Sequence, residues 1–420
     1  MTTIQPGRRR VVITGMGAIT ALGQSVQAFW DSLVAGRSGL AAITQFDASQ
    51  LPCRVAGEVV GFNPTDWMER ADARRVSRAS QFGVAAARQA IQDAGLTAES
   101  VDPNRTGVCV GTGFVGIEKV DEGLNVMAGR GHTRIGPFLL IAALANMPAH
   151  HAGLLLGARG PTVTVVTACA AGTQGIGEGA EYIRRGLADV MISGGVEAAI
   201  HPLAIAGFAA MRALSTHHND EPALTMSPYD KDREGFVVGE GAGIMILEEL
   251  EHARARGAHV YCEVLGSAAS ADAHHVAAPD PDAEGAILAM QWALQSAGIT
   301  PDAIDYINPH GSSTPVGDVT ETLAMKTVFG ERAHHIPISS TKSMIGHSLG
   351  AAGALEAIAC VKTIETGWIH PTINYVTPDP ECDLDYVPNT ARQADVRVAL
   401  SNSFGLGGQN ASLILGKLDG

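Results

Sequence analysis

Short apolar runs rich in β-branched residues alternate with longer stretches of helical period along almost the whole chain, and this alternation constrains the fold most strongly. The runs form two sets: "RVVITG", "TGVCVG", "TVTVVT", "DVMISGG" and "GIMILEE", and then "VYCEVLGSA", "IDYINPHG", "IPISSTKS", "VRVALSNSFG" and "ASLILGK". Helices are expected between them, for example over residues 81–94 and 284–297, each followed by a glycine of C-cap type. The order predicts a layered α/β fold with parallel strands.

The two sets of strands predict two similar halves. In the first half a strand, "TACAAG" and a helix follow one another, and in the second half a strand, "TKSMIGHSLGAAG" and a helix do the same. The charged segment "ARARGAH", residues 253–259, separates the two sets. We therefore expect halves at residues 1–258 and 259–420, packed closely because no long linker joins them.

Composition excludes several classes of protein. A hydrophobic content of 46% is too high for a disordered chain, and a formal net charge of -14 argues against a nucleic-acid partner. The longest apolar zone, "FLLIAALANMPAHHAGLLLG", is interrupted by Pro148, His150 and His151, so no membrane span is expected. The six cysteines occur singly, without the spacing of a zinc site, which predicts no metal and reduced thiols in the cytoplasm.

One cysteine stands out because of its neighbours. In "TVTVVTACAAGTQGIG" a strand runs into Cys169, and the small residues after it permit a sharp strand-to-helix turn. A thiol at a helix N-terminus is expected to be stabilised as the thiolate, and the amides there could hold an oxyanion. A buried structural cysteine is the alternative, and it is the better interpretation of the other five: Cys53, Cys109, Cys262, Cys360 and Cys382.

Two histidines also lie in turns rich in glycine. "INPHGSSTPVGD" places His310 at the end of a predicted strand, where active sites of α/β sheets gather. "SSTKSMIGHSLGAAGALE" contains Lys342, His347 and Glu356. A cysteine with a histidine could form a protease pair, whereas two histidines and a lysine suggest N–H donors around a carbonyl that becomes an enolate.

A third glycine-rich stretch, "SNSFGLGGQNASLILG", lies between two predicted strands near the C-terminus. Neither a Lys-Ser/Thr pair nor a helix follows it, which argues against a phosphate loop. Its glycines indicate a close backbone approach or a mobile turn.

Taken together and in order, "VTACAAG", "INPHGSSTPVGD", "SSTKSMIGHSLGAAGALE" and "NSFGLGGQN" resemble the β-ketoacyl-acyl carrier protein (ACP) synthases, most closely their bacterial chain-elongating synthase II branch. "RALSTHHNDEP" and "SPYDKDREGFVVGEGAG" fit as well. The resemblance implies a thiolase-like fold. In such a fold two similar halves, each with a five-stranded sheet, stack as a five-layer α/β/α/β/α sandwich, and the chain forms a homodimer.

The resemblance also implies an acyltransferase and a set of roles. Cys169 would take an acyl group from acyl-ACP, and decarboxylated malonyl-ACP would attack it to give 3-oxoacyl-ACP in fatty acid elongation. His310 and His347 would stabilise the enolate, Lys342 would organise the site, and Glu356 would support it. The amides of Cys169 and Leu406 would form the oxyanion hole. No cofactor is implied, because the phosphopantetheine of ACP carries the substrates.

Some residues bear on the substrate. The residues implied to contact it are Phe114, Phe208, Ser312, Thr314, Phe404 and Leu406. Leu406 stands where the family usually has phenylalanine. Phe114 occupies an acyl-pocket position where a smaller aliphatic is common, so we expect short or medium acyl chains. Pro309 and Ala277 also depart from the usual pattern.

ACP is acidic in this family, and "RADARRVSR" offers Arg70, Arg74, Arg75 and Arg78 to it, with Arg212 as a further candidate. Arg74, Arg75 and Arg212 are the predicted docking residues, and a solvated basic helix is the alternative. The ketosynthase subunit of a type II polyketide synthase shares all the implied catalytic residues and stays open as an alternative function. A non-catalytic chain-length subunit also stays open, although such subunits usually lack the nucleophile.

Overall fold

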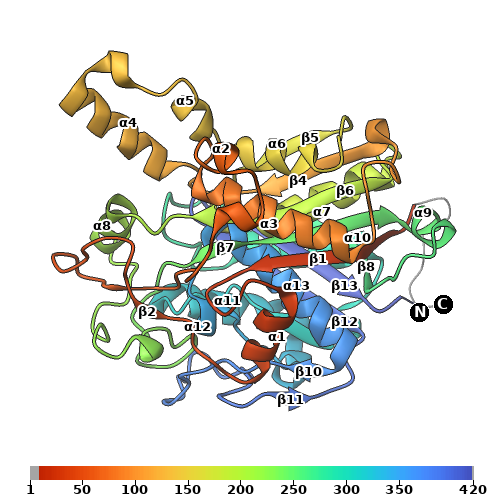
Figure 1. Cartoon of the computed structure of the whole chain (residues 1–420). Helices are drawn as coiled ribbons and strands as arrows, with labels where there is room; N and C mark the ends of the chain where they lie inside the picture. The colour runs from red at the N-terminus through yellow and green to blue at the C-terminus, as the bar shows by residue number, and fades with distance from the viewer. Residues whose placement is uncertain (1–8, 419–420) are drawn as a thin grey trace.

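A nine-stranded mixed sheet runs through the computed structural model, which describes residues 9–418 (Figure 1). The strand order is β5-β4-β6-β7-β1-β8-β13-β12-β9. The strands are β1 (Val11–Ile19), β4 (Thr106–Gly111), β5 (Thr162–Val165), β6 (Val190–Ala198), β7 (Glu240–Glu249), β8 (Cys262–Ala271), β9 (Tyr306–Asn308), β12 (Val398–Gly405) and β13 (Gln409–Gly416). The first five strands in chain order lie together on one side, and the last four lie together on the other.

Helices form three layers around these two groups of strands. The middle layer consists of α7 (Ala171–Arg184) and α13 (Ala352–Thr366), which pack against each other and against strands of both groups. The first group is covered on its outer face by α3 (Arg78–Asp93) and α6 (Met147–Leu154). The second group is covered by α10 (Glu284–Ala297), with α11 (Pro315–Phe329) beside it. The predicted five-layer thiolase-like sandwich of two similar halves is thus confirmed.

The buried apolar side chains follow the same layering. One large cluster surrounds α7 and α13, a second lies between α3 and the first group of strands, and a third lies between α10 and the second group. Close approach is needed where α7 meets the sheet. A Cβ on Gly111, at the end of β4, would lie 2.0 Å from the carbonyl oxygen of Ala171, so only glycine lets the start of α7 sit there.

Strand direction differs from the expectation of parallel strands. β4 is parallel to β5 and β6, and β9 is parallel to β12, but β7, β1, β8 and β13 pair antiparallel with their neighbours. The cause is visible in β12 and β13, which a short glycine turn joins as a hairpin and which must therefore run antiparallel.

The predicted strand "IPISSTKS" is also wrong in extent. It makes only an isolated bridge, in which Ile338 pairs with Ile307 of β9. Pro337 has no N–H to give to a ladder, and the chain turns into α12 (Lys342–Ile345) a few residues later. The second half therefore has four strands and a bridge where the resemblance implies five.

The boundary expected at residue 258 falls between α9 (Leu250–Ala255) and β8. Because β1 pairs with both β7 and β8, the sheet continues across this point. The division into halves at 258 stays a prediction.

The remaining elements are short or peripheral. The helices are α1 (Val26–Val34), α2 (Arg70–Ala73), α4 (Ile117–Arg130), α5 (Leu139–Ala142) and α8 (Pro202–Ala210). Two small sheets pair β2 (Ala41–Ala42) with β3 (Val55–Ala56) and β10 (Trp368–Ile369) with β11 (Arg392–Gln393). Figure 1 shows α4 and α5 projecting from the body of the molecule. None of the helices within residues 9–418 is both long and apolar enough to cross a membrane.

Candidate active site

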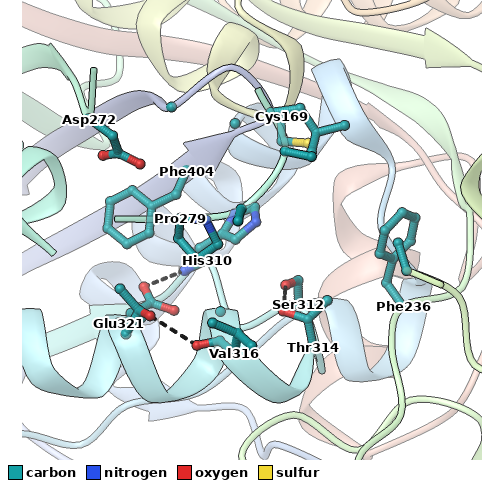
Figure 2. A pocket seen from close by; sticks show the side chains of 18 of the residues that line it. Cys169, Phe236, Asp272, Pro279, His310, Ser312, Thr314, Val316, Glu321 and Phe404 are labelled. Carbon is teal, nitrogen blue, oxygen red and sulfur yellow. Dashed lines mark hydrogen bonds between the residues drawn. The ribbon is translucent and has the colours of Figure 1, made fainter. Parts of the chain in front are cut away.

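Cys169 lies on the sharp turn that the sequence predicts. β5 ends at Val165, Ala168 takes a positive φ of 48°, and residues 168–170 form a 3-10 turn that leads into α7. A positive φ is strained for a residue with a Cβ, and such strain is common at functional turns. The thiol faces a cavity that His310 and Phe404 also line (Figure 2). The other five cysteines are buried and free, as expected.

The protonation of Cys169 differs from the expectation. Burial raises the pKa of the thiol to about 11, and the charges of Glu197 and Glu356 raise it as well. The Lys342 charge and a hydrogen bond from the Leu406 amide lower it but do not offset the loss of water. The shift is therefore in the direction opposite to the expected stabilisation of the thiolate.

Two histidine rings meet at the wall of the same cavity. The rings of His310 and His347 are 5.3 Å apart between centroids and nearly perpendicular. Nδ1 of His347 accepts a hydrogen bond of 3.3 Å from the amide of Leu349, so its proton is carried by Nε2. Burial and the charge of Lys342 lower the pKa of both imidazoles well below the usual value. Both rings are neutral at pH 7, and each offers an N–H donor.

Lys342 organises the loop that carries His310. Its ammonium donates a hydrogen bond of 2.6 Å to the carbonyl oxygen of His310 and forms an ion pair with Glu356. Neither charged side chain is exposed to solvent. Burial raises the pKa of Glu356 to about 7, and Lys342 opposes that rise. The pair thus joins α12, α13 and the turn after β9.

A further carboxylate, which the sequence reasoning missed, holds the same loop. The oxygens of Glu321 accept the amide hydrogens of His310 and Gly311, both at 2.7 Å, and the hydroxyl of Tyr229 at 2.8 Å. Glu321 lies on α11, below His310 in Figure 2. A sequence signal existed, because Asp318, Glu321 and Thr322 have the i, i+3, i+4 spacing of one helix face, and that face is buried.

The cavity has a volume of about 390 Å³. Most predicted site residues line it: Cys169, Phe208, Arg212, His310, Ser312, Thr314, His347, Phe404 and Leu406. The hydroxyls of Ser312 and Thr314 lie 3.2 Å apart on one wall (Figure 2). Lys342 and Glu356 are not among the lining residues and support the cavity from behind it.

Phe114 is not among the residues that line this cavity, and its place in an acyl pocket stays a prediction. Its side chain is 44% exposed, and its ring packs edge-on against Phe208 at 6.1 Å between centroids. Its amide donates a hydrogen bond to the carboxylate of Glu197. Phe114 thus packs against a ring, that of Phe208, which lines the cavity.

The two predicted oxyanion-hole amides lie close together. The amide of Leu406 acts to lower the pKa of the Cys169 thiol, and both residues line the cavity. A Cβ added to Gly405 would lie 3.2 Å from the backbone nitrogen of Cys169, so the glycine turn after β12 passes directly beside the cysteine turn. Both amides are therefore next to the sulfur.

The predicted docking arginines lie in different settings. Arg212 lines the cavity. Arg75 stacks on the ring of Phe138, 5.0 Å from its centroid, and Arg74 is exposed at the end of α2. Arg78 is not available for docking, because its guanidinium pairs with the buried carboxylate of Glu240.

Comparison with known proteins identifies the family. Residues 8–253 match the Beta-ketoacyl synthase, N-terminal domain, and residues 261–376 match the Beta-ketoacyl synthase, C-terminal domain. This chain belongs to the β-ketoacyl synthase family. It is 48% identical over 410 residues to 3-oxoacyl-[acyl-carrier-protein] synthase 2 of Synechocystis sp., covering 98% of each chain. It is 46% identical over 411 residues to the Staphylococcus aureus protein of the same name, covering 98% of this chain and 99% of that one. The family resemblance drawn from the motifs is confirmed.

Solved structures agree with this membership. A ketosynthase of a type II polyketide system, solved in complex with its ACP, is similar to this synthase with a TM-score of 0.91 and 36% identity, covering 98% of this chain and all of that one. The likeness extends over both halves, so the layered fold is that of a ketosynthase.

Proposed function

We propose that this chain is a 3-oxoacyl-ACP synthase that elongates acyl chains in fatty acid synthesis. The observation that carries the proposal is one cavity lined by the thiol of Cys169 and the neutral imidazoles of His310 and His347. The near-full-length identity to 3-oxoacyl-[acyl-carrier-protein] synthase 2 proteins supports the same reaction.

In the first half-reaction the sulfur of Cys169 attacks the thioester carbonyl of acyl-ACP. The carbonyl oxygen gains negative charge, which the amides of Cys169 and Leu406 stabilise as preorganised donors. The bond to the phosphopantetheine sulfur then breaks, and the proton lost by Cys169 ends on that leaving thiol. The products are acyl-Cys169 and free ACP.

In the second half-reaction malonyl-ACP loses CO2. The electron pair of the broken C–C bond forms an enolate, whose oxygen is stabilised by the N–H donors of His310 and His347. The enolate carbon attacks the acyl carbonyl, the bond to Cys169 breaks, and the sulfur takes a proton from solvent. A 3-oxoacyl-ACP two carbons longer is released.

Lys342, Glu356 and Glu321 act through the backbone of the His310 loop. Lys342 holds the carbonyl of His310, and Glu321 holds its amide. The loop is thereby bonded on both sides, which keeps the imidazole oriented toward Cys169. No cofactor takes part in these steps, because ACP carries both substrates on its phosphopantetheine.

The partner and assembly follow from the same proposal. ACP is the proposed carrier, with Arg74, Arg75 and Arg212 on this chain as docking residues. A homodimer is proposed because exposed apolar side chains gather on the projecting segment, among them Leu124, Met127, Leu140 and Ile141. Sedimentation of the full chain tests this assembly. The cytoplasm is the proposed location, since it suits the six unpaired cysteines.

Intact mass spectrometry with a panel of acyl-ACPs tests the reaction. We expect an acyl adduct on the wild-type protein, none on Cys169→Ala, and release of CO2 when malonyl-ACP is added. An adduct that persists on Cys169→Ala contradicts the proposed mechanism.

The ketosynthase subunit of a type II polyketide system is the second candidate, because such a ketosynthase shares the fold across the whole chain. The two differ in product when no ketoreductase is present. One condensation followed by arrest indicates fatty acid elongation, and repeated condensation without reduction indicates a polyketide enzyme. The presence of Cys169 at the cavity argues against a non-catalytic chain-length subunit.

A further inference from the structure

A buried carboxylate that the proposed chemistry does not use lies next to the active site. Glu197 is the penultimate residue of β6, and its side chain has no exposure to solvent. Its oxygens accept the amide hydrogens of Gly113 at 2.8 Å, Phe114 at 3.0 Å and Gly350 at 3.1 Å. Among the residues that the structure describes, no lysine, arginine or histidine side chain forms an ion pair with it.

The three amides belong to two turns that are far apart in the sequence. Gly113 and Phe114 lie in the turn from β4 to α4, and Phe114 packs on Phe208 of the cavity wall. Gly350 follows Leu349, whose amide donates to Nδ1 of His347. The turns are in direct contact, since a Cβ on Gly350 would lie 2.6 Å from the backbone nitrogen of Gly113.

The segment after His347 needs such an anchor. Leu349 has a positive φ of 44°, a conformation that a residue with a Cβ adopts only when its surroundings enforce it. The hydrogen bond from Gly350 to Glu197 holds the residue directly after this strained position. If the anchor is lost, the Leu349 amide that selects the His347 tautomer is free to rotate.

A carboxylate suits this place better than an amide or an apolar side chain. Three N–H donors converge on two oxygens, whereas glutamine offers one acceptor oxygen and an NH₂ group that faces donors. An apolar side chain would leave all three amides unpaired in the interior. Burial raises the pKa of Glu197 to about 7, and the amide hydrogen bonds oppose that rise.

We propose that Glu197 is a positioning residue for the condensation, which sets the Phe114–Phe208 wall of the cavity and the orientation of His347 through one carboxylate. The inference rests on the proposed function. It predicts that one substitution affects both half-reactions, although Glu197 does not line the cavity.

The test uses the full chain with Glu197→Gln and, as a carboxylate of altered reach, Glu197→Asp. Two quantities are measured: the ratio of Cys169 acylation rates with C4-ACP and C12-ACP, and the kcat and KM of CO2 release from malonyl-ACP. For Glu197→Gln we expect an acylation ratio changed at least fivefold and a kcat lowered at least tenfold, with KM within twofold. Glu197→Asp keeps the charge but has a shorter side chain. Its acylation ratio and kcat are expected to lie between those of Glu197→Gln and the wild type.

The matched control is Glu248→Gln. Glu248 is another buried carboxylate, which lies on β7 and is bonded to Arg256 and Thr14. The control variant should leave both quantities within twofold of the wild type. The inference is overturned if the acylation ratio and the kcat of Glu197→Gln are both within twofold of the wild type. If that variant does not fold, the same result for Glu197→Asp overturns it. Acylation and CO2 release by the wild type test the proposed function. The ratios of variant to wild-type rates test the positioning role of Glu197.

Discussion

Lys342 and Glu356 form an ion pair in which neither side chain reaches solvent, and the same ammonium donates to the carbonyl of His310. Two charges are therefore kept inside the protein at the point where the loop that carries His310 meets α13. Pairs of this kind are costly to desolvate and are rarely the most stable choice for a protein core. Their presence here is explained by the orientation that they impose on His310.

Breaking this pair should affect stability and activity differently. Glu356→Gln leaves the Lys342 charge buried without a partner, which we expect to lower the free energy of unfolding by about 3–5 kcal/mol. The double variant Lys342→Met with Glu356→Leu removes both charges and should recover most of that stability without recovering condensation. Urea denaturation and CO2 release measure the two effects. A double variant as unstable as Glu356→Gln would contradict the argument.

The reactivity of Cys169 should depend steeply on pH. Because the thiol has a pKa of about 11, the thiolate fraction rises about tenfold per pH unit between pH 7 and 10. Alkylation by iodoacetamide, followed by intact mass, should rise with the same slope, and Cys169→Ala gives the background from the five buried cysteines. A plateau near pH 7 would instead support the helix-stabilised thiolate expected from the sequence.

Acyl-chain preference should depend on Phe114. We expect the wild type to acylate Cys169 faster with C4-ACP than with C16-ACP, because two aromatic rings in contact limit the cavity on the Phe208 side. Phe114→Ala removes the support of Phe208 and should raise the C16 rate relative to the C4 rate by roughly tenfold, the effect of about 1.4 kcal/mol. Equal rates of the wild type with C4 and C16 would refute the preference.

Charge reversal at the basic run should weaken use of the carrier. Arg74→Glu with Arg75→Glu is expected to raise the KM for malonyl-ACP by roughly tenfold at low salt, and less at high salt, because exposed charges are screened. Alkylation of Cys169 by iodoacetamide should not change. Arg254→Glu, an exposed arginine on α9, is the control. Equal effects of the two changes would show that these arginines do not dock the carrier.

Acid stability should depend on Glu248, whose carboxylate pairs with Arg256 and bonds His252 and Thr14. Burial raises the pKa of this carboxyl, but these contacts together outweigh burial and lower it from 4.5 to about 2. Because the folded pKa is the lower one, the stabilisation of about 3 kcal/mol is present above pH 4.5 and is lost as the pH falls toward 2. The difference in unfolding free energy between wild type and Glu248→Gln should shrink over that range. If this difference in unfolding free energy stays constant from pH 6 to 3, the carboxylate of Glu248 does not stabilise the fold as argued.

Most secondary-structure elements and local turns could be predicted from the sequence, because these depend on neighbours along the chain. β4 and α10 occupy the residues that periodicity predicts, and the small residues around Cys169 produce the turn expected of them. The motifs around His310 and His347 also led to two histidines that the structure brings within 5.3 Å of each other.

Which groups meet from distant positions in the chain, and how far water is excluded from them, could not be predicted from the sequence because both depend on how the whole chain packs. Glu197 and Glu321 show no pattern that reveals their partners, since the amides that they bind lie on other segments. The pKa of Cys169 is raised because burial outweighs the charge of Lys342, a residue distant in the sequence. Phe114 is absent from the cavity lining, and its amide is bonded to Glu197 from a strand distant in the sequence. In each case the deciding quantity is a long-range contact or the loss of solvent, which local sequence does not specify.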